Sequence, residues 1–251
     1  MQHLLEIKDV SLNYHTLKDE TKAIEKISFY ADNNEFISIV GPSGCGKTTL
    51  LSIIAGILKP SSGTIFLNGT PTYEVKNKIG YMFQRDHLFE WRTVLQNVKL
   101  GLEITKNKDE SNLKYLEELL QKYGLYDFKD KYPNHLSGGM RQRVALIRTL
   151  VLRPEILLLD EPFGALDYQT RKLVIQDVSD IITREQKTSL LVTHDLGEAV
   201  SLSDRIIVLS KRPSFVKAEF TTNLRKIPLI EERKKTDEYK ELVEKIWKEL
   251  S

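Results

Sequence analysis

The chain has 251 residues, 41% of them hydrophobic, and its 37 basic and 35 acidic residues leave a net charge of +2. This length fits one large domain or a core with a subdomain. The near-neutral charge argues against nucleic acid as a partner, because nucleic-acid-binding domains usually concentrate positive charge. A single cysteine excludes an intrachain disulfide, which fits a reducing compartment. We expect no signal peptide and no membrane span, since every apolar run is far shorter than the ~20 residues that a bilayer requires.

Strands with one helix are predicted over the first third of the chain. The run 36–40 is short, apolar and β-branched, so it predicts a buried strand that leads into a glycine-rich loop. A helix is predicted over about 50–58, because apolar residues recur there at helical spacing and Pro60 follows. Further strands are predicted at about 5–14, 24–29, 64–67 and 79–83.

Helical spacing predominates from about 88 to 153, and Pro154 ends it. Strand patterns return at 156–159, 190–193 and 205–209, which predicts an α/β core interrupted by a helical insert. Residues 239–250 predict an amphipathic helix. We expect this helix to pack on the protein's own core and not on a membrane, since Glu and Lys mix on its polar face.

Residues 41–48 match the phosphate-loop pattern G-x-x-x-x-G-K-[ST] between a strand and a helix. Glycines let backbone N–H groups turn towards phosphates, and the following helix presents its positive end. Lys47 supplies a charge towards the β- and γ-phosphates, and Thr48 supplies a hydroxyl for Mg²⁺. Cys45 needs no catalytic role, but its alkylation is expected to block nucleotide binding sterically. The predicted nucleotide-binding residues of the loop are Gly41, Pro42, Ser43, Gly44, Cys45, Gly46, Lys47, Thr48 and Thr49.

Asp160 and Glu161 follow an apolar strand, where a carboxylate can hold Mg²⁺ directly or through water. The alternative for Glu161 is a carboxylate at a helix N-terminus, stabilised by the helix dipole. Pro162 weakens this alternative because it favours a turn.

Ser137, Gly138 and Gly139 open the helix that carries Met140. Ser137 is a good N-cap, and a glycine-flanked helix N-terminus also lets an anion approach closely. Both interpretations can hold together.

Three other residues are weak signals when taken alone. A glutamine after a strand, such as Gln84, is usually surface, and a histidine at a strand end, such as His194, is more often structural. Tyr14 is as compatible with a core position as with stacking on a base. Their order relative to the other motifs is what gives them weight.

In this order the motifs resemble those of the ATP-binding subunit of an ABC (ATP-binding cassette) transporter, over about residues 4–213. The resemblance implies an α/β fold of the P-loop NTPase (RecA-like) type, with an N-terminal antiparallel β-subdomain and an inserted α-helical subdomain. We expect a single ABC ATPase domain over 1–251. Its core with the β-subdomain would occupy about 1–87 and 154–215, its helical subdomain about 88–153, and a C-terminal extension about 216–251.

The resemblance also implies the role of each motif. Glu161 would orient and activate the attacking water as general base. Gln84 would contact Mg²⁺ or that water, and His194 would contact the γ-phosphate. The signature residues would bind the γ-phosphate held by the opposite subunit, although Met140 replaces the family's usual glutamine. Asp167 would cross the dimer interface, and Tyr14 would stack on adenine. The expected catalytic residues are Lys47, Gln84, Glu161 and His194; the expected metal ligands are Thr48, Gln84 and Asp160; and the expected second nucleotide contact is Ser137, Gly138 and Gly139.

A site that needs Ser137 from a second chain implies a homodimer with ATP and Mg²⁺ buried between equal faces. The resemblance further implies transmembrane permease subunits, an indirectly coupled extracytoplasmic substrate-binding protein, and a peripheral place on the cytoplasmic face of the membrane. Residues 88–98, 194–200 and 210–213 resemble importers of the nitrate/sulfonate/taurine group, whose relatives also move pyrimidine precursors. Trp91 and Arg92 lie where the family receives the permease's coupling helix, with a core position for Trp91 as an equal alternative.

Other classes of protein remain as alternatives. A non-transport ABC ATPase acting on DNA or ribosomes is disfavoured, because the chain holds one cassette and only about ninety residues, without sustained heptads, separate Lys47 from Ser137. A small-molecule kinase gives no role to Ser137 or His194. A pure interaction module does not explain the intact set of Lys47, Asp160 and Glu161.

Overall fold

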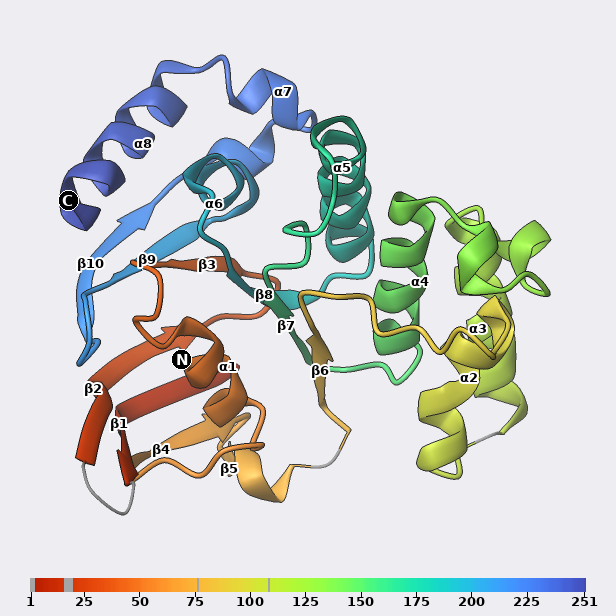
Figure 1. Ribbon diagram of the computed structural model, residues 1–251, viewed down its shortest axis with the longest axis horizontal. Coiled ribbons are helices and arrows are strands. Elements are labelled where there is room, and N and C mark those ends of the chain that lie inside the picture. The colour runs from red at the N-terminus through yellow and green to blue at the C-terminus, as the bar shows by residue number, and fades with distance from the viewer. Residues whose placement is uncertain (1–2, 16–19, 76, 108) are drawn as a thin grey trace. The chain divides into compact units, whose positions relative to one another are not determined.

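The computed structural model describes residues 3–15, 20–75, 77–107 and 109–251 (Figure 1). The chain divides into two compact units, one formed by Met1–Lys76 with Lys187–Ser251 and the other by Asn77–Gln186. The predicted α/β class, with an antiparallel β-subdomain and a helical part, is confirmed. Within the described ranges, no helix combines the length and apolar character needed to cross a membrane.

An antiparallel sheet forms the β-subdomain of the first unit, with the order β2-β1-β4-β5. β1 is an interior strand of this sheet, and its Ile7 pairs with Phe29 of β2 on one side and Ile65 of β4 on the other. Register shifts interrupt the pairing of β1 with β2 at several points, and these bulges explain the broken alternation of the sequence there. The strands are β1 (Leu5–His15), β2 (Glu20–Ala31), β4 (Ser62–Leu67) and β5 (Thr70–Pro71).

A second sheet in the same unit carries the phosphate loop. The central strand β3 (Phe36–Val40) is parallel to β8 (Thr188–Val192) and to β9 (Arg205–Leu209), and every residue of these strands is buried. Burial of whole strands is typical of parallel sheets covered on both faces. The antiparallel edge strand β10 (Val216–Thr221) pairs with β9. Two helices of this unit are α1 (Lys47–Ile54) and α6 (Leu196–Leu202).

The chain ends in α7 (Ile230–Arg233) and α8 (Asp237–Leu250), and α8 lies beside α6 and β10 (Figure 1). Leu242 and Ile246 of α8 are buried in a cluster with Val200 and Val208. The expected packing of this helix on the protein's own core is therefore confirmed. Trp247, the residue after Ile246 on the same helix, is by contrast 63% exposed.

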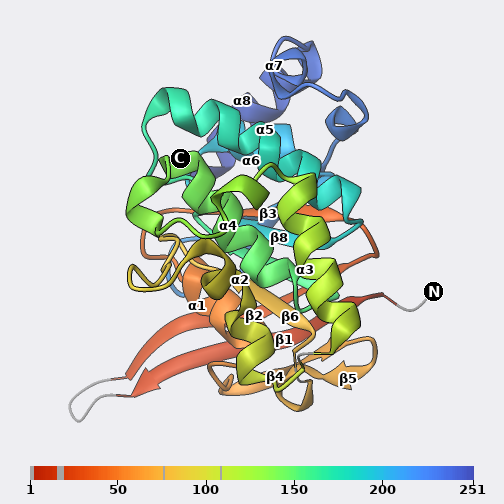
Figure 2. The same cartoon turned by 90° about the vertical axis from the view of Figure 1, so that its right-hand side faces the viewer.

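The second unit joins a short parallel strand pair to four helices. β6 (Ile79–Met82) pairs with β7 (Ile156–Asp160), with Met82 opposite Leu159. The helix α4 packs against α2 on one side and α5 on the other, and α3 lies against α2 (Figures 1 and 2). Thr93 begins α2 with a complete capping box. The helices are α2 (Val94–Ile104), α3 (Glu110–Lys122), α4 (Gly138–Leu150) and α5 (Tyr168–Arg184).

Neighbouring residues of α8 allow a matched test of its packing. Ile246→Ala is expected to lower the free energy of unfolding by about 2–5 kcal/mol, because it opens a cavity in a closed cluster. Trp247→Ala is expected to change it by about 0.5 kcal/mol or less, as a surface substitution does. Urea unfolding followed by circular dichroism measures both. Equal losses in the two variants would contradict the packing of α8 described above.

Candidate functional site

The phosphate loop connects the buried end of β3 to the first turn of α1. Gly44 and Gly46 have φ angles of +74° and +110°, a region that side chains other than glycine rarely adopt. Gly46 is the N-cap residue of α1, in the left-handed conformation. The glycines at these positions therefore let the backbone wrap around the N-terminus of the helix, as an anion-binding loop requires.

Lys47 is buried within the loop that precedes it. Its Nζ donates hydrogen bonds to the carbonyl oxygens of Gly41 at 2.8 Å and Pro42 at 3.1 Å, and lies 4.0 Å from Cys45 Sγ. A Cβ added at Gly41 would lie 2.8 Å from that sulfur, so residue 41 must lack a side chain. The loop thus holds the charge of Lys47 among carbonyl dipoles at the end of β3.

Tyr14 lies at the helix that follows the loop. Its hydroxyl is 3.3 Å from Thr49 Oγ1, in the first turn of α1, and 40% of the residue is exposed. The alternative of a core position for Tyr14 is therefore wrong. Thr48 is exposed in the same turn.

His194 is exposed in the turn between β8 and α6. Because β3 and β8 are parallel, with Ile39 opposite Val192, the turn with His194 and the phosphate loop leave the same edge of the sheet. The turn itself is held by hydrogen bonds from Thr193 Oγ1 to the buried Glu198 at 2.7 Å and from the Asp195 amide to Thr193 Oγ1 at 3.1 Å. Sequence reasoning missed both of these supports.

The second unit places Gln84, Asp160 and Glu161 at or just after the ends of its parallel strands. Asp160, the last residue of β7, is 7% exposed and accepts a hydrogen bond from the Tyr81 hydroxyl at 3.2 Å. Gln84 Nε2 lies 3.4 Å from Glu161 Oε2. Glu161 has a φ angle of +45° and lies in a turn. The alternative of a helix-terminal carboxylate is therefore wrong, and the turn expected from Pro162 is confirmed.

Ser137 caps α4, where its hydroxyl oxygen accepts from the Met140 amide at 3.3 Å. The glycines after it allow close packing, because a Cβ at Gly139 would lie 2.8 Å from Val174 and one at Gly138 would lie 3.2 Å from Leu166. The expected capping is confirmed.

Asp167 caps α5 in the same way. Its carboxylate accepts from the amides of Gln169 and Thr170, both at 3.1 Å. Hydrogen bonding to Thr170 and the neighbouring amides lowers the pKa of the Asp167 carboxyl, so the residue is a carboxylate at neutral pH.

Two arginines of α4, which sequence reasoning missed, hold the segment after Gln84. Arg141 pairs with Asp86 at 2.8 Å and Glu90 at 2.9 Å, and Arg148 donates to the carbonyl oxygens of Asp86 and His87. Burial opposes ionisation of Asp86, but the hydrogen bonds from Arg141 and the Leu88 amide outweigh it and lower the pKa of the carboxyl.

Trp91, a little further along this segment, is 73% exposed. The alternative of a core position for Trp91 is therefore wrong.

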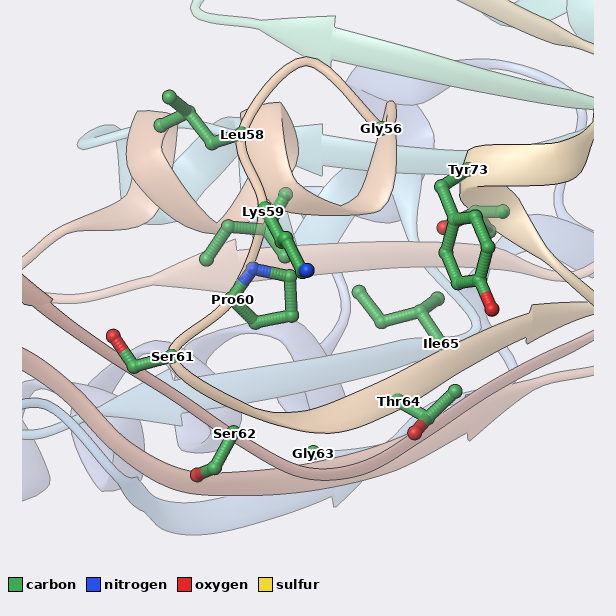
Figure 3. Close-up of a pocket in the computed structure, with 12 residues that line it drawn as sticks. Gly56, Leu58, Lys59, Pro60, Ser61, Ser62, Gly63, Thr64, Ile65 and Tyr73 are labelled. Carbon is green, nitrogen blue, oxygen red and sulfur yellow. The ribbon is translucent and has the colours of Figure 1, made fainter.

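The first unit also contains a cavity of about 530 Å³ (Figure 3). Ile53, Pro60 and Ile65 line it together with Tyr73, and Lys59 is the one charged residue among those that line it. None of the predicted site residues is among them. Cavity volume therefore does not mark the candidate site here, since a phosphate loop presents backbone N–H groups at a surface.

Comparisons with known proteins agree with the motifs. A family model described as ABC transporter matches residues 24–164, more than half of the chain. The uncharacterised ABC transporter ATP-binding protein YtlC of Bacillus subtilis is 43% identical, covering 98% of this chain and 95% of that protein. The nitrate import ATP-binding protein NrtD of Synechocystis is 41% identical, covering 94% and 88%. The taurine import ATP-binding protein TauB of Pelagibacter ubique is 41% identical, covering 85% and 81%.

Solved structures of the bacterial ABC transporter cassette MJ0796 are also similar. A dimeric structure of that cassette aligns with a TM-score of 0.73 and 33% identity over 87% of this chain and 99% of the other. A structure of its post-hydrolysis state bound to ADP and Pi aligns equally well. The present chain therefore belongs to the ABC transporter family, within which it is an ATP-binding subunit and an ATP hydrolase. The resemblance inferred from the motifs is confirmed.

The buried thiol of the phosphate loop gives a test of the loop's packing. Burial raises the pKa of the Cys45 thiol, against the opposing charge of Lys47, and Cys45 is only 1% exposed. The thiolate is the reactive form, so iodoacetamide at pH 8 is expected to label the native chain at least about ten-fold more slowly than the urea-unfolded chain. Mass spectrometry measures the rate. Chain labelled at Cys45 is expected to lose nucleotide binding, and rapid native labelling would contradict the burial.

Proposed function

We propose that this chain binds Mg-ATP through its phosphate loop and hydrolyses it with Glu161 as general base. The observation that carries the proposal is the position of the motifs after parallel strands, with the loop and His194 in one unit and Gln84 and Glu161 in the other. Ligands of α/β proteins bind at such strand ends. Lys47 and His194 would contact the γ-phosphate, Gln84 would orient the water, and Tyr14 would stack on adenine.

The proposed metal ligands have the chemistry that Mg²⁺ prefers. Mg²⁺ takes oxygen ligands and is usually held by one or two protein groups together with phosphates and water. Asp160 offers a nearly buried carboxylate, and Thr48 offers a hydroxyl in the first turn of α1. When bound, the ion would neutralise charge on the phosphates. Gln84 would be the third protein residue to contact the ion.

We further propose that two copies of the chain form the complete site. Ser137, Gly138 and Gly139 begin α4 as an N-terminus suited to an anion, and the similar cassette MJ0796 is described as dimeric. In the dimer, this end of α4 would contact the γ-phosphate held by the other copy, and Asp167 would lie at the interface.

The transport role proposed is that of an importer subunit on the cytoplasmic face of the membrane. The relatives named for nitrate and taurine import support this role, and so do the residues that resemble that group. The cargo class proposed is nitrate, sulfonates such as taurine, or pyrimidine precursors. The exposed Trp91 would contact a transmembrane permease, which in turn would receive cargo from an extracytoplasmic binding protein.

Replacement of the proposed general base separates ATP binding from hydrolysis. Glu161→Gln is expected to lower kcat by about 10²–10⁴-fold, the usual contribution of a general base, while ATP binding persists. Closed dimer should then accumulate with Mg-ATP, which light scattering detects. Glu155→Gln is the matched control, because Glu155 pairs with Lys78 before the start of β7. A monomeric Glu161→Gln variant in Mg-ATP would count against the dimer.

Purification of the chain from gently solubilised membranes tests the importer role. A multi-span protein recovered in about equal amount is expected, and its companion binding protein can then be screened against nitrate, sulfonates and pyrimidine-like compounds. Trp91→Ala should lose the multi-span protein, whereas Trp247→Ala should retain it, since both residues are exposed. Recovery of ribosomes or DNA factors alone would disprove the transport role and leave the ATPase assignment intact.

A further inference from the structure

We infer that Gln142 is a positioning residue for hydrolysis, which holds the turn of Glu161 in place relative to α4. The inference rests on the proposed role of Glu161 as general base. Gln142 lies on α4, one and a half turns after Ser137, and its side chain reaches the polypeptide immediately after Glu161.

The contact is a single directed hydrogen bond. Gln142 is 3% exposed, and its Nε2 donates to the carbonyl oxygen of Pro162 at 2.8 Å. A carbonyl oxygen only accepts, so the amide nitrogen and not the amide oxygen must face it. Gln142 Oε1 is buried and has no hydrogen-bond partner among the described residues. A buried acceptor without a donor is unfavourable, so packing alone does not account for a glutamine here.

The turn that receives this bond needs external support. Glu161 has a φ angle of +45°, a conformation that costs energy for a residue other than glycine and persists only where its surroundings hold it. The Gly164 amide donates to the Glu161 carbonyl at 3.1 Å, and Phe163 is buried. Gln142 adds a hydrogen bond from outside the turn, which ties the Pro162–Phe163 peptide, one residue beyond Glu161, to α4.

This tie gives the N-terminal half of α4 two related tasks. Ser137, at its N-terminus, is proposed to meet the γ-phosphate held by the other copy, and Gln142 lies about 7.5 Å further along the same rigid helix. A displacement of the helix when Ser137 engages the phosphate would therefore be transmitted through the Pro162 carbonyl to the backbone of Glu161. A small misplacement of a catalytic group can cost about 10²-fold in rate.

The test is Gln142→Met, which keeps the side-chain length and removes the donor. Purified variant and wild-type chains are compared for kcat, KM for ATP, nucleotide affinity and thermal unfolding. The expected result is a fall in kcat of about ten-fold, with KM and nucleotide affinity within about two-fold of wild type. Gln176→Met is the matched control. The side-chain amide of Gln176 donates to Asp180, and both residues lie on α5. Gln142→Asn, which withdraws the donor yet stays polar, is expected to lower kcat in the same way, so poor folding of one variant does not decide the result.

Each outcome bears on the inference. A purely structural role for Gln142 would lower the melting temperature and leave kcat per folded molecule equal to that of Gln176→Met, which would overturn the inference. Glu161→Gln, measured alongside, separates this failure from failure of the proposed function. If Glu161→Gln loses turnover and Gln142→Met does not, only the positioning role is wrong. If Glu161→Gln turns over like wild type, the general-base role is wrong and the inference falls with it.

Discussion

Parallel strand pairing is the constraint on which both parts of the candidate site depend. β3 with β8, and β6 with β7, end in register, so that the turns following each pair leave from one edge. The apolar side chains of β3, β7 and β8 are buried, and a shift of register would expose them or bury charge. The charged residue of the second pair comes at the end of its strand: Asp160 is the last residue of β7, is 7% exposed and precedes a turn.

Helix N-termini provide the second recurring element. Ser137 and Asp167 cap α4 and α5, contacts that typically contribute about 0.5–2 kcal/mol each. A serine hydroxyl accepts and also donates. Ser137 Oγ accepts a hydrogen bond from the Met140 amide. Its O–H group can therefore still donate a hydrogen bond to an anion. The same residue can therefore cap the start of a helix and bind a ligand, which is why the structural and the functional interpretation of the sequence do not compete.

Local patterns in the sequence were enough to predict β3 and β9 with their observed ends, because short β-branched runs bounded by polar residues have few alternatives. The order of the motifs along the chain was also enough to identify the candidate site residues. The helix α5 was not predicted, although Val174, Val178 and Ile181 repeat at helical spacing within it.

The hydrogen bond of Gln142 to Pro162 and the pairing of Arg141 with Asp86 could not be predicted. Both join segments distant in sequence, and their polar residues carry no periodic signal. Exposure of Trp91 was undecided for a similar reason, since an aromatic residue suits a core and a binding surface equally well.

The positions of the two tryptophans have an optical consequence. Each compact unit contains one of them, Trp91 in the second and Trp247 in the first, and both face solvent. Their fluorescence is therefore sensitive to whatever covers them. With either one replaced by phenylalanine, the tryptophan emission of the chain, excited apart from that of its tyrosines, would come from a single unit, so that spectroscopy could follow the two units separately during a catalytic cycle without any attached dye.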